Sequence, residues 1–402
     1  MGEFEQTRLG NLCDFTQGVQ IADKDTIKQP QDGYVRYIYI RDLFTDKFPV
    51  YVKDVYPNKL LLSGDIVMVN TGNTSGSVYQ AKEGVLCNNA FKIAVKSSKL
   101  NKLDKGFLWV YLNSDARERM LKRLFNPAGQ PHVGHKNIAR LDISLPPLPE
   151  QRKIAKILST WDKAISTTEL LIDNSKQQKK ALMQQLLTGA HTQRKRLLDD
   201  SGNPFEGEWE EVKLGDVSDV RDGTHDSPSF IDSGYPLITS KNLLPSGKLD
   251  LNNVKFISKE DYEQINKRSN VNVGDILFGM IGTIGNPVRV SSNDYAIKNV
   301  ALIKEKQSLL NSFLIFYISS LDIAKQFHRL NAGGTQKFIA LGVIRNLVIR
   351  MPTHEEQLKI AAVLTNADKE IELLEHQLAD LKQEKKALMQ KLLTGKRRVT
   401  VS

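Results

Sequence analysis

The sequence predicts an α+β protein made of two mixed α/β domains, each followed by a long helix. The two helices are expected to pair as an antiparallel coiled coil with pseudo-twofold symmetry. Three observations lead to this prediction. The 402 residues carry one pattern twice, each copy ends in a stretch with a 3.5-residue apolar period, and the part before that stretch alternates short β-type runs with turn residues.

The repeat is clearest at the end of each copy. Residues 176–189 and 382–395 are identical at 12 of 14 positions, an offset of 206. Weaker matches pair Gly2–Glu5 with Gly207–Glu210, Gly64–Ile66 with Gly274–Ile276, and Asn89 with Asn299. The two ends therefore do the same job, while the parts before them share a fold and present different surfaces.

The repeat also predicts the division of the chain. The segments are a first domain (1–148), a first long helix (149–189), a linker (190–206), a second domain (207–352), a second long helix (353–395) and a basic tail (396–402). We refer below to residues 1–148 as the first domain and to residues 207–352 as the second domain.

Each long helix carries an apolar seam in alternating steps of four and three, which is typical of a coiled coil. Pro149 suits a first helical turn, Thr353 with Glu356 forms a capping-box pattern, and Gly189 and Gly395 end the helices. The seam residues are Ile154, Leu158, Trp161, Ile165, Ile172, Leu182, Leu186, Ile360, Leu364, Ile371, Leu374, Leu378, Leu381, Leu388 and Leu392. Lys179 and Lys385 fall at the same seam position and are interpreted as register devices or snorkelling stems.

Antiparallel pairing of the two helices is favoured, because it relates the two copies by a pseudo-twofold axis. A helix of about 40 residues is roughly 60 Å long. The polar linker 190–206, fully extended, spans about 56–61 Å. A parallel arrangement therefore also remains open.

Both domains are predicted to be mixed α and β. The expected strands are 34–40, 65–70 and 91–95 in the first domain and 275–278 and 300–303 in the second. One helix is expected in each, 107–124 and 311–330, and a closing edge strand, 141–145 or 347–351, leads into each long helix.

Composition excludes several classes of protein. Two cysteines, Cys13 and Cys87, cannot form a disulfide framework or a multi-cysteine zinc site, and the seven histidines show no ligand spacing, so no metal is expected. No apolar stretch is long enough for a membrane span, and the start of the chain lacks a secretory pattern, so a cytoplasmic location is expected. A net charge of +10 favours a polyanionic partner.

Catalytic motifs are weak, which indicates a binding protein and no catalytic residues. Gly279, Gly282 and Gly285 follow an apolar strand, but their spacing is not that of a dinucleotide-binding loop, and a tight turn or a close backbone approach to a ligand is the better interpretation. The Ser, His and Asp within 223–227 are adjacent on one loop, which does not make a catalytic triad.

Basic residues gather in three places. The ends of the two long helices are rich in Lys and Arg, which is consistent either with the helix dipole or with phosphate contact. Arg117, Arg119, Lys122 and Arg123 form a third cluster on a predicted helix, interpreted as a solvated face.

The chain resembles the specificity subunits of type I restriction–modification systems. Two divergent α/β domains, each followed by a near-identical helix, carry this resemblance. The motifs that support it are Leu148–Ile154 at a domain–helix junction, Lys179–Gly189 at a helix end, Gly207–Glu210 before the second domain and Gly223–Pro228 within it. The resemblance covers nearly the whole chain.

The resemblance implies a subunit without an active site of its own. Each domain would read one half of an asymmetric, bipartite site in double-stranded DNA, and the paired helices would set the spacer and dock two modification (methyltransferase) subunits. Restriction (endonuclease/translocase) subunits would then join. S-adenosylmethionine would belong to the modification subunit, and ATP with magnesium to the restriction subunit, so no cofactor is expected in this chain.

Base reading requires hydrogen-bond donors and acceptors on loops, whereas phosphate contacts supply affinity without sequence information. We expect fewer than half of the candidates to contact DNA, and Arg41 and Lys241, at matching places, to contact phosphate. The candidates are Arg41, Thr71, Asn73, Thr74, Ser75, Gln130, His132, His135, Lys136, Asn137, Thr224, His225, Asp226, Ser240, Lys241, Asn242, Thr283, Thr335, Gln336 and Lys337.

Two other functions are compatible with the sequence. One is a stand-alone, sequence-specific DNA-binding regulator with an internal coiled coil. The other is an enzyme, such as a methyltransferase, with an unrecognised site. Copurification with methyltransferase chains separates a specificity subunit from a regulator, and DNA methylation by the purified chain alone would identify an enzyme.

Overall fold

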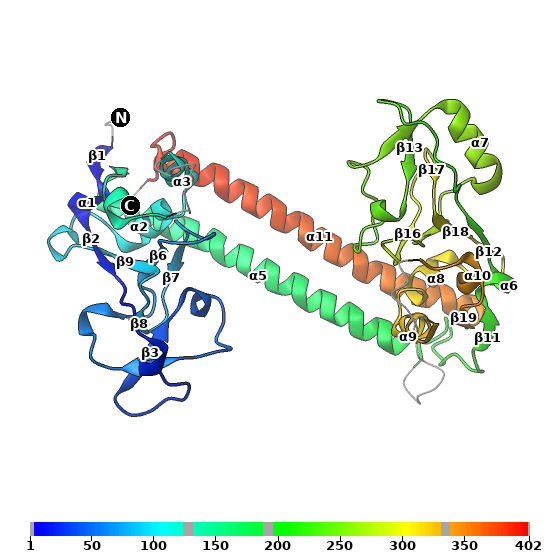
Figure 1. The fold of residues 1–402 in the computed structure, drawn as a ribbon, viewed down its shortest axis with the longest axis horizontal. Helices are drawn as coiled ribbons and strands as arrows, with labels where there is room; N and C mark the ends of the chain where they lie inside the picture. The colour runs from blue at the N-terminus through cyan, green and yellow to red at the C-terminus, as the bar shows by residue number, and fades with distance from the viewer. Residues whose placement is uncertain (1–3, 124–131, 188–195, 331–337, 401–402) are drawn as a thin grey trace. The chain divides into compact units, whose positions relative to one another are not determined.

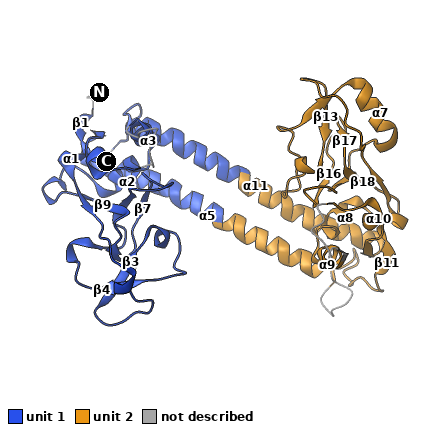
Figure 2. Cartoon of the chain, viewed as in Figure 1, with its two compact units in different colours: residues 1–169, 376–402 blue, residues 170–375 orange. Residues whose placement is uncertain are grey.

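The computed structural model describes residues 4–123, 132–187, 196–330 and 338–400 (Figure 1). The chain forms two compact units (Figure 2). Unit 1 comprises residues 1–169 and 376–402, and unit 2 comprises residues 170–375. Each unit contains one of the two domains together with part of both long helices. The domain boundaries drawn from the repeat remain a prediction, and we describe each unit by itself.

The first domain is built on two four-stranded sheets, ordered β2-β9-β6-β7 and β4-β3-β8-β5, and one two-stranded sheet, β1-β10. Its strands are β1 (Glu5–Arg8), β2 (Cys13–Gln17), β3 (Tyr34–Ile38), β4 (Tyr51–Lys53), β5 (Leu60–Leu61), β6 (Ile66–Val69), β7 (Val78–Gln80), β8 (Gly84–Leu86), β9 (Ala90–Val95) and β10 (Asp142–Leu145). Its helices are α1 (Leu9–Leu12), α2 (Lys105–Leu112), α3 (Asp115–Lys122) and α4 (His135–Ala139), and its short 3₁₀ turns are η1 (Asp23–Asp25), η2 (Ile40–Leu43), η3 (Pro57–Lys59) and η4 (Ser97–Lys99).

The second domain repeats this plan with sheets ordered β12-β18-β15-β16, β14-β13-β17 and β11-β19. Its strands are β11 (Glu210–Lys213), β12 (Asp219–Asp222), β13 (Tyr235–Ile238), β14 (Lys255–Ile257), β15 (Ile276–Gly279), β16 (Gly285–Arg289), β17 (Ala296–Ile297), β18 (Val300–Lys304) and β19 (Val348–Met351). Its helices are α6 (Leu214–Val217), α7 (Lys259–Ser269), α8 (Asn311–Tyr317), α9 (Leu321–Leu330) and α10 (Leu341–Arg345), with one 3₁₀ turn, η5 (Ser240–Asn242).

The single helix predicted in each domain is wrong, because the structure has two helices there. In the first domain the break comes at Ser114, whose hydroxyl accepts a hydrogen bond from the Arg117 N–H (3.2 Å) and so caps α3. In the second domain the Ser320 hydroxyl lies 3.5 Å from the Ile323 N–H and caps α9 in the same way. A serine hydroxyl at this position accepts a hydrogen bond from a backbone N–H of the residues that follow. The preceding helix therefore ends and a new helix begins there.

The closing strand of each domain pairs with the strand that opens it. β10 lies antiparallel to β1, and β19 lies antiparallel to β11. The opening strands follow the repeated Gly–Glu–aromatic–Glu motif. That motif therefore marks the point where the start of each domain is tied to its end, immediately before the long helix.

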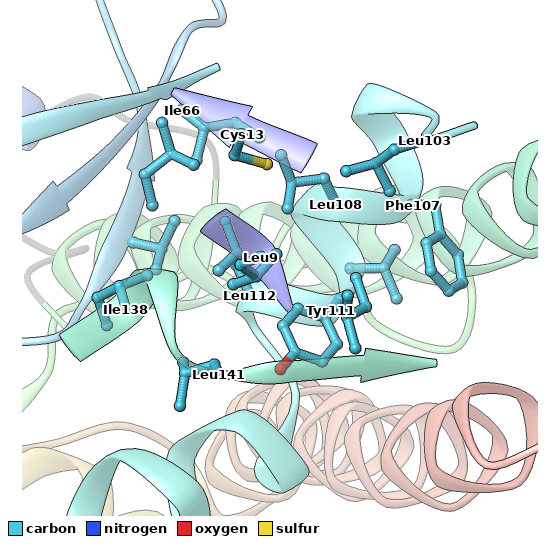
Figure 3. Close-up of a cluster of buried hydrophobic side chains, with 14 of the residues drawn as sticks. Leu9, Cys13, Ile66, Leu103, Phe107, Leu108, Tyr111, Leu112, Ile138 and Leu141 are labelled. Carbon is cyan, nitrogen blue, oxygen red and sulfur yellow. The ribbon is translucent and has the colours of Figure 1, made fainter. Parts of the chain in front are cut away.

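The core of unit 1 lies between the β2-β9-β6-β7 sheet and the helices (Figure 3). Leu9, Phe107 and Leu108 are fully buried there, from α1 and α2. Ile154 and Leu158, near the start of the long helix α5 (Leu148–Leu186), belong to the same cluster. So do Met389, Leu392 and Leu393, near the end of the second long helix, α11 (His354–Leu393). Burial of this apolar surface attaches both helices to the domain.

The two long helices pair antiparallel within each unit, and the predicted fold class is confirmed. All fifteen predicted seam residues are buried or partly buried, whereas most residues between them are exposed. In unit 1, Lys385 Nζ lies 2.5 Å from Asp162 Oδ1 and Lys382 Nζ lies 2.7 Å from Glu169 Oε1. Unit 2 contains the equivalent ion pairs between the matching residues of the repeat. Lys179 pairs with Asp368 (2.5 Å) and Lys176 pairs with Glu375 (2.7 Å).

The ion pairs bear on the proposed phosphate contacts at the helix ends. Four of the lysines there already neutralise carboxylates of the other helix. The seam lysines Lys179 and Lys385 each reach an aspartate across the pair, as expected of a register device. We therefore do not retain these lysines as phosphate contacts.

A fully buried glutamine joins each domain to its long helix. Gln151 Oε1 accepts a hydrogen bond from the Asp104 N–H (2.9 Å), while Nε2 donates to the carbonyls of Lys102 (2.7 Å) and Pro146 (2.9 Å). Gln357 makes the equivalent three bonds, with Leu310, Ser308 and Pro352. The amide thus satisfies three backbone groups at the domain–helix junction.

The neighbouring glutamate ties in the segment that follows the other helix. Buried Glu150 accepts from Arg398 Nε (2.8 Å) and Nη2 (2.7 Å), and these bonds lower the pKa of that carboxyl. In unit 2, buried Glu356 accepts from Arg196 Nε (3.0 Å) and from the Trp209 indole N–H (3.1 Å). Because Glu356 faces these partners, only the Thr353 half of the predicted capping box forms.

We expect Gln151→Leu to destabilise unit 1 by about 3 kcal/mol, because three buried backbone groups lose their partner. Chemical unfolding with urea measures the change. Gln178→Leu, an exposed site on the same helix, is the matched control and should change stability by less than about 0.5 kcal/mol. Equal stabilities of the two variants would show that the Gln151 bonds do not hold the junction.

Candidate nucleic-acid interface

In the second domain, several loops meet at one edge of the β12-β18-β15-β16 sheet. We call residues 223–228, 239–242, 280–284 and 298–299 the second loop edge. The Thr224 N–H donates to the Ile297 carbonyl (3.1 Å), and the Asn299 N–H donates to the Thr224 carbonyl (3.2 Å). Gly223 permits this approach, since a Cβ there would lie 2.4 Å from the Ile297 oxygen.

The first domain assembles the equivalent loops, which we call the first loop edge: residues 17–20, 39–43, 70–77, 87–89 and 132–133. The Asn70 N–H donates to the Asn89 carbonyl (3.0 Å), and the Val133 N–H donates to the Asn70 carbonyl (2.8 Å). Gly18 plays the part of Gly223, because a Cβ there would lie 1.9 Å from the Cys87 oxygen. Both edges are therefore fixed by backbone hydrogen bonds and leave polar side chains to vary.

Most described candidates of the first domain lie at or beside its loop edge. Thr71 and Ser75 are partly buried in the 70–77 loop, and Asn73 and Thr74 are exposed at its tip. His132 is exposed and its backbone pairs with Thr71. His135, Lys136 and Asn137 lie on α4, where the His135 ring meets the Phe91 ring edge-on at 6.3 Å. Arg41 is exposed over the Tyr39 ring, and Gln130 lies outside the described residues.

The candidates of the second domain differ in exposure. His225, Asp226 and Lys241 are exposed, and Thr224 and Thr283 are partly buried. Thr283 lies in the turn between β15 and β16, where Gly282 (φ +71°) and Gly285 (φ +91°) adopt left-handed backbone. This is the tight turn that the glycine pattern predicted. Thr335, Gln336 and Lys337 lie outside the described residues.

Ser240 and Asn242 are buried, so we leave them out of the proposed contact set. The Ser240 hydroxyl donates to the Asn299 carbonyl (3.1 Å) and accepts from the Met280 N–H (3.1 Å). Asn242 Oδ1 accepts from the Thr239 N–H (3.0 Å), while its Nδ2 donates to two carbonyls of the following loop. Their polar groups hold the loops together. The sequence shows two polar loop residues and does not show which way they face.

Several polar residues at the loop edges were not among the candidates. In the first domain, Asn70 and Gln17 hold the Asn88 carbonyl, and Asn88 Nδ2 donates to Gln20 (3.3 Å). In the second domain, Asn299 and Lys298 contact the 223–228 loop. A signal existed for Asn299, because Asn89 and Asn299 match in otherwise divergent parts of the repeat.

Arg117 is buried, so the interpretation of its cluster as a solvated face is wrong for this residue. Its Nε donates to the Leu112 carbonyl (2.6 Å) and its Nη1 donates to the Gly76 carbonyl (2.8 Å). Burial lowers the pKa of its guanidinium. Arg117 therefore fastens the 70–77 loop, with candidates Thr71 to Ser75, to helix α3. Arg119 on the same helix is exposed.

Within the described residues, no three His, Cys, Asp or Glu side chains are placed to hold a metal ion. None of the described helices has the length and apolarity of a membrane span.

Unit 2 contains a groove of about 1150 Å³ between the second domain and its helix pair. Three ion pairs border it: Lys176 with Glu375, Lys179 with Asp368, and Lys248 with Glu372. Phe278, Phe316 and Phe327 contribute to its apolar lining.

Comparison with known proteins identifies the class. The family model described as the type I restriction modification DNA specificity domain matches residues 1–174 and again residues 206–383. These matches cover both copies of the repeat. The chain therefore belongs to this family of DNA specificity proteins.

Individual members are similar over nearly the full length. The chain is 27% identical over 413 residues to the type I restriction enzyme MjaVIII specificity subunit of Methanocaldococcus jannaschii, covering 99% of this chain and 93% of that protein. It is 25% identical to the EcoBI specificity subunit of Escherichia coli, covering 88% and 76%.

The fold is also found in solved structures. The type I restriction–modification S subunit from M. genitalium matches with a TM-score of 0.61 at 14% identity, covering 97% of this chain and 96% of that one. A chain from a structure titled for complex assembly and conformational transition of the type I R-M system matches with a TM-score of 0.58 at 18% identity, covering 99% of each.

We expect Arg117→Met to destabilise unit 1 by about 2–4 kcal/mol, since two carbonyls lose a charged donor inside the domain. Arg119→Met, two residues further along α3 at an exposed position, should stay within about 0.5 kcal/mol of the unchanged chain. Thermal unfolding of both variants measures this difference. If the two variants unfolded together, the guanidinium would not be what fastens the 70–77 loop.

Proposed function

We propose that this chain is the DNA-recognition subunit of a type I restriction–modification complex. Each domain reads one half of an asymmetric, bipartite site in double-stranded DNA. The observation that carries this proposal is the uneven divergence of the repeat. The two helix pairings repeat the same Lys–Asp and Lys–Glu ion pairs, while the two loop edges carry different side chains.

The loop edges have the chemistry that base reading requires. Hydroxyl, amide and imidazole groups supply donors and acceptors for base edges. In the first domain these are Thr71, Asn73, Thr74 and Ser75, with His132, His135, Lys136 and Asn137 beside them. In the second they are Thr224, His225, Asp226 and Thr283. Because the two sets differ, the two half-sites differ.

Phosphate contact is proposed for Arg41 and Lys241. Both are exposed and follow matching strands, β3 and β13. The residue after each is buried and caps its turn: Asp42 accepts from the Tyr39 N–H (2.9 Å) and Asn242 from the Thr239 N–H (3.0 Å). Each cation thus stands on a fixed turn, which suits a positioning contact to the DNA backbone.

The paired helices are proposed to set the spacer between the half-sites and to dock two methyltransferase subunits. Half-sites about one DNA turn apart, roughly 34 Å, present the same face of the duplex. The chemistry is assigned to the other subunits: S-adenosylmethionine on the methyltransferase, and ATP with magnesium on the restriction subunit. This chain itself is proposed to be non-catalytic and to act in the cytoplasm, where the target DNA lies.

Genome-wide mapping of methylated positions, in cells with and without this gene, tests the proposal. The expected result is one bipartite motif that disappears with the gene. Copurification should recover the chain with two methyltransferase chains. A chain that binds DNA tightly without partners and leaves the methylation pattern unchanged would be a stand-alone regulator. A chain that methylates DNA alone would be an enzyme.

Exchanging residues 1–145 for the corresponding domain of another family member should alter one half of the methylated motif and leave the other half unchanged. The reason is that each loop edge is held by contacts inside its own domain. Motif mapping in cells carrying the hybrid measures the outcome. A change in both half-sites would contradict the assignment of one domain to one half-site.

Insertion of one heptad at equivalent places in both helices, after Ile172 and after Leu378, should widen the spacer without altering either half-site. Seven residues add about 10 Å of helix, which corresponds to up to about three base pairs. The same mapping measures the spacer. Insertion in one helix alone is the control, because it shifts the ion pairs out of register and should abolish methylation. An unchanged spacer in the double insertion would show that the helices do not set it.

A further inference from the structure

Three polar side chains of the second domain form a chain at the second loop edge. His225 Nδ1 lies 2.8 Å from Asn299 Oδ1, and His225 Nε2 lies 2.8 Å from Asp222 Oδ2. Both ring nitrogens therefore face acceptor oxygens. The histidine side chain is 57% exposed, whereas the aspartate side chain is only 11% exposed. These hydrogen bonds thus link the buried carboxylate of Asp222, through His225, to the amide of Asn299 at the surface.

The backbone of Asn299 is fixed on both sides. Its N–H donates to the Thr224 carbonyl (3.2 Å), and its carbonyl accepts from the Ser240 hydroxyl (3.1 Å). Asn299 has φ +53°, in the left-handed region that residues other than glycine seldom adopt. Such a conformation persists where the surroundings hold it, often at a binding site. The amide is therefore presented at a defined place.

The charges around His225 favour its protonated form. Asp222 comes from β12 and also bonds Arg268 of α7, while Asp226 lies on the same loop and Lys298 comes from the turn after β17. The hydrogen bonds to Asn299 and to Asp222 raise the pKa of His225 above its ordinary 6.5, while its partial burial and the charge of Arg268 act in the opposite direction. In the imidazolium, both ring N–H groups donate, one to each acceptor.

This arrangement orients the amide of Asn299. Because its Oδ1 accepts from His225, its Nδ2 is the group left to face outward. No hydrogen bond of Nδ2 occurs among the described residues. A neutral histidine with its proton on Nε2 would instead present a lone pair at Nδ1, which favours the opposite amide orientation. The protonated ring therefore fixes the Asn299 amide so that its donor Nδ2, and not its acceptor Oδ1, faces outward.

We propose that Asn299 reads a hydrogen-bond acceptor on a base edge in the half-site bound by the second domain, and that His225 is the residue that positions its amide. This rests on the proposed function of the chain. In the major groove the acceptors are purine N7, guanine O6 and thymine O4. The adjacent carboxylate of Asp222 does not take part in reading, since Arg268 and His225 occupy it.

Among the described residues of the first domain, this chain of hydrogen bonds is not repeated. The residue matching Asn299 is Asn89, whose Oδ1 accepts only a long bond from the Thr71 hydroxyl (3.5 Å) among the described residues. The residue matching His225 is Gln20, which bonds Asn88 instead. The proposed reading device therefore belongs to one half-site alone, and its variants should leave the other half-site untouched.

Motif mapping in cells that carry the full complex tests the reading role. Asn299→Ala should relax the preference at one base pair of the second half-site, lowering discrimination there by about tenfold. Asn299→Asp, which replaces the donor by an acceptor, should disfavour the original base. Asn293→Asp, the same change at an exposed turn of this domain, is the matched control and should leave the motif unchanged.

The outcomes separate this inference from the proposed function. If the unchanged chain gives no bipartite motif, the proposed function fails. If it gives one and both Asn299 variants keep every base preference, this inference fails. A uniform loss of methylation without a change in base preference would identify a phosphate contact, and it would overturn the reading role as well.

A pH profile tests the positioning role of His225. The imidazolium is present below the raised pKa, so DNA binding by the assembled complex should be strongest at acidic pH and fall as pH rises through that pKa. His225→Gln is neutral and can still donate to Asn299 Oδ1, so it should keep the base preference and lose the pH step. His225→Ala should lose both. Fluorescence anisotropy with the mapped target measures these effects. A pH step that persists in His225→Ala would contradict the role.

Discussion

A buried carboxylate at the start of each long helix constrains how the helices associate. Glu150 and Glu356 lose solvent on folding, and an unpaired buried charge would destabilise the structure strongly. Each is paired with an arginine from the segment that follows the other helix: Arg398 for Glu150 and Arg196 for Glu356. Within each unit, therefore, the beginning of one helix must lie beside the end of the other. Antiparallel pairing meets this requirement, and parallel pairing would leave both carboxylates without these partners.

The same constraint explains why the two ends of the repeat stay alike while the domains diverge. The helix beginning must offer a glutamate to the other helix's following segment and a glutamine to its own domain. The seam must also keep lysine opposite aspartate. A change in either copy would break a contact made with the other copy or with the domain. The exposed side chains of the loop edges face no such requirement, because the loop backbones are held by hydrogen bonds within each domain and by buried residues such as Ser240 and Asn242.

The sequence predicted what depends on periodicity and repetition, and it failed where a polar residue has two possible uses. The seam period placed Ile154 and Leu364 in the helix pair, and both are fully buried. The 107–124 helix was predicted as continuous because Ser114 can lie within a helix or cap one. Arg117 looked like a surface cation, and Ser240 and Asn242 looked like loop contacts, because composition does not show whether a side chain turns toward the backbone or toward solvent. Asn299 was visible only as a residue that the repeat retains.

The turns η2 and η5 show how one fold separates residues that hold a turn from residues that it exposes. At the buried position the two domains keep residues that accept the same backbone hydrogen bond, Asp42 and Asn242. At the adjacent exposed position they carry Arg41 and Lys241, which differ in geometry though not in charge. A substitution at the buried position would leave a backbone N–H without its partner and destabilise the turn. A substitution at the exposed position alters only what the surface offers to a ligand. Alternation of these two kinds of position along a loop lets the exposed side chains change while the backbone that presents them stays folded.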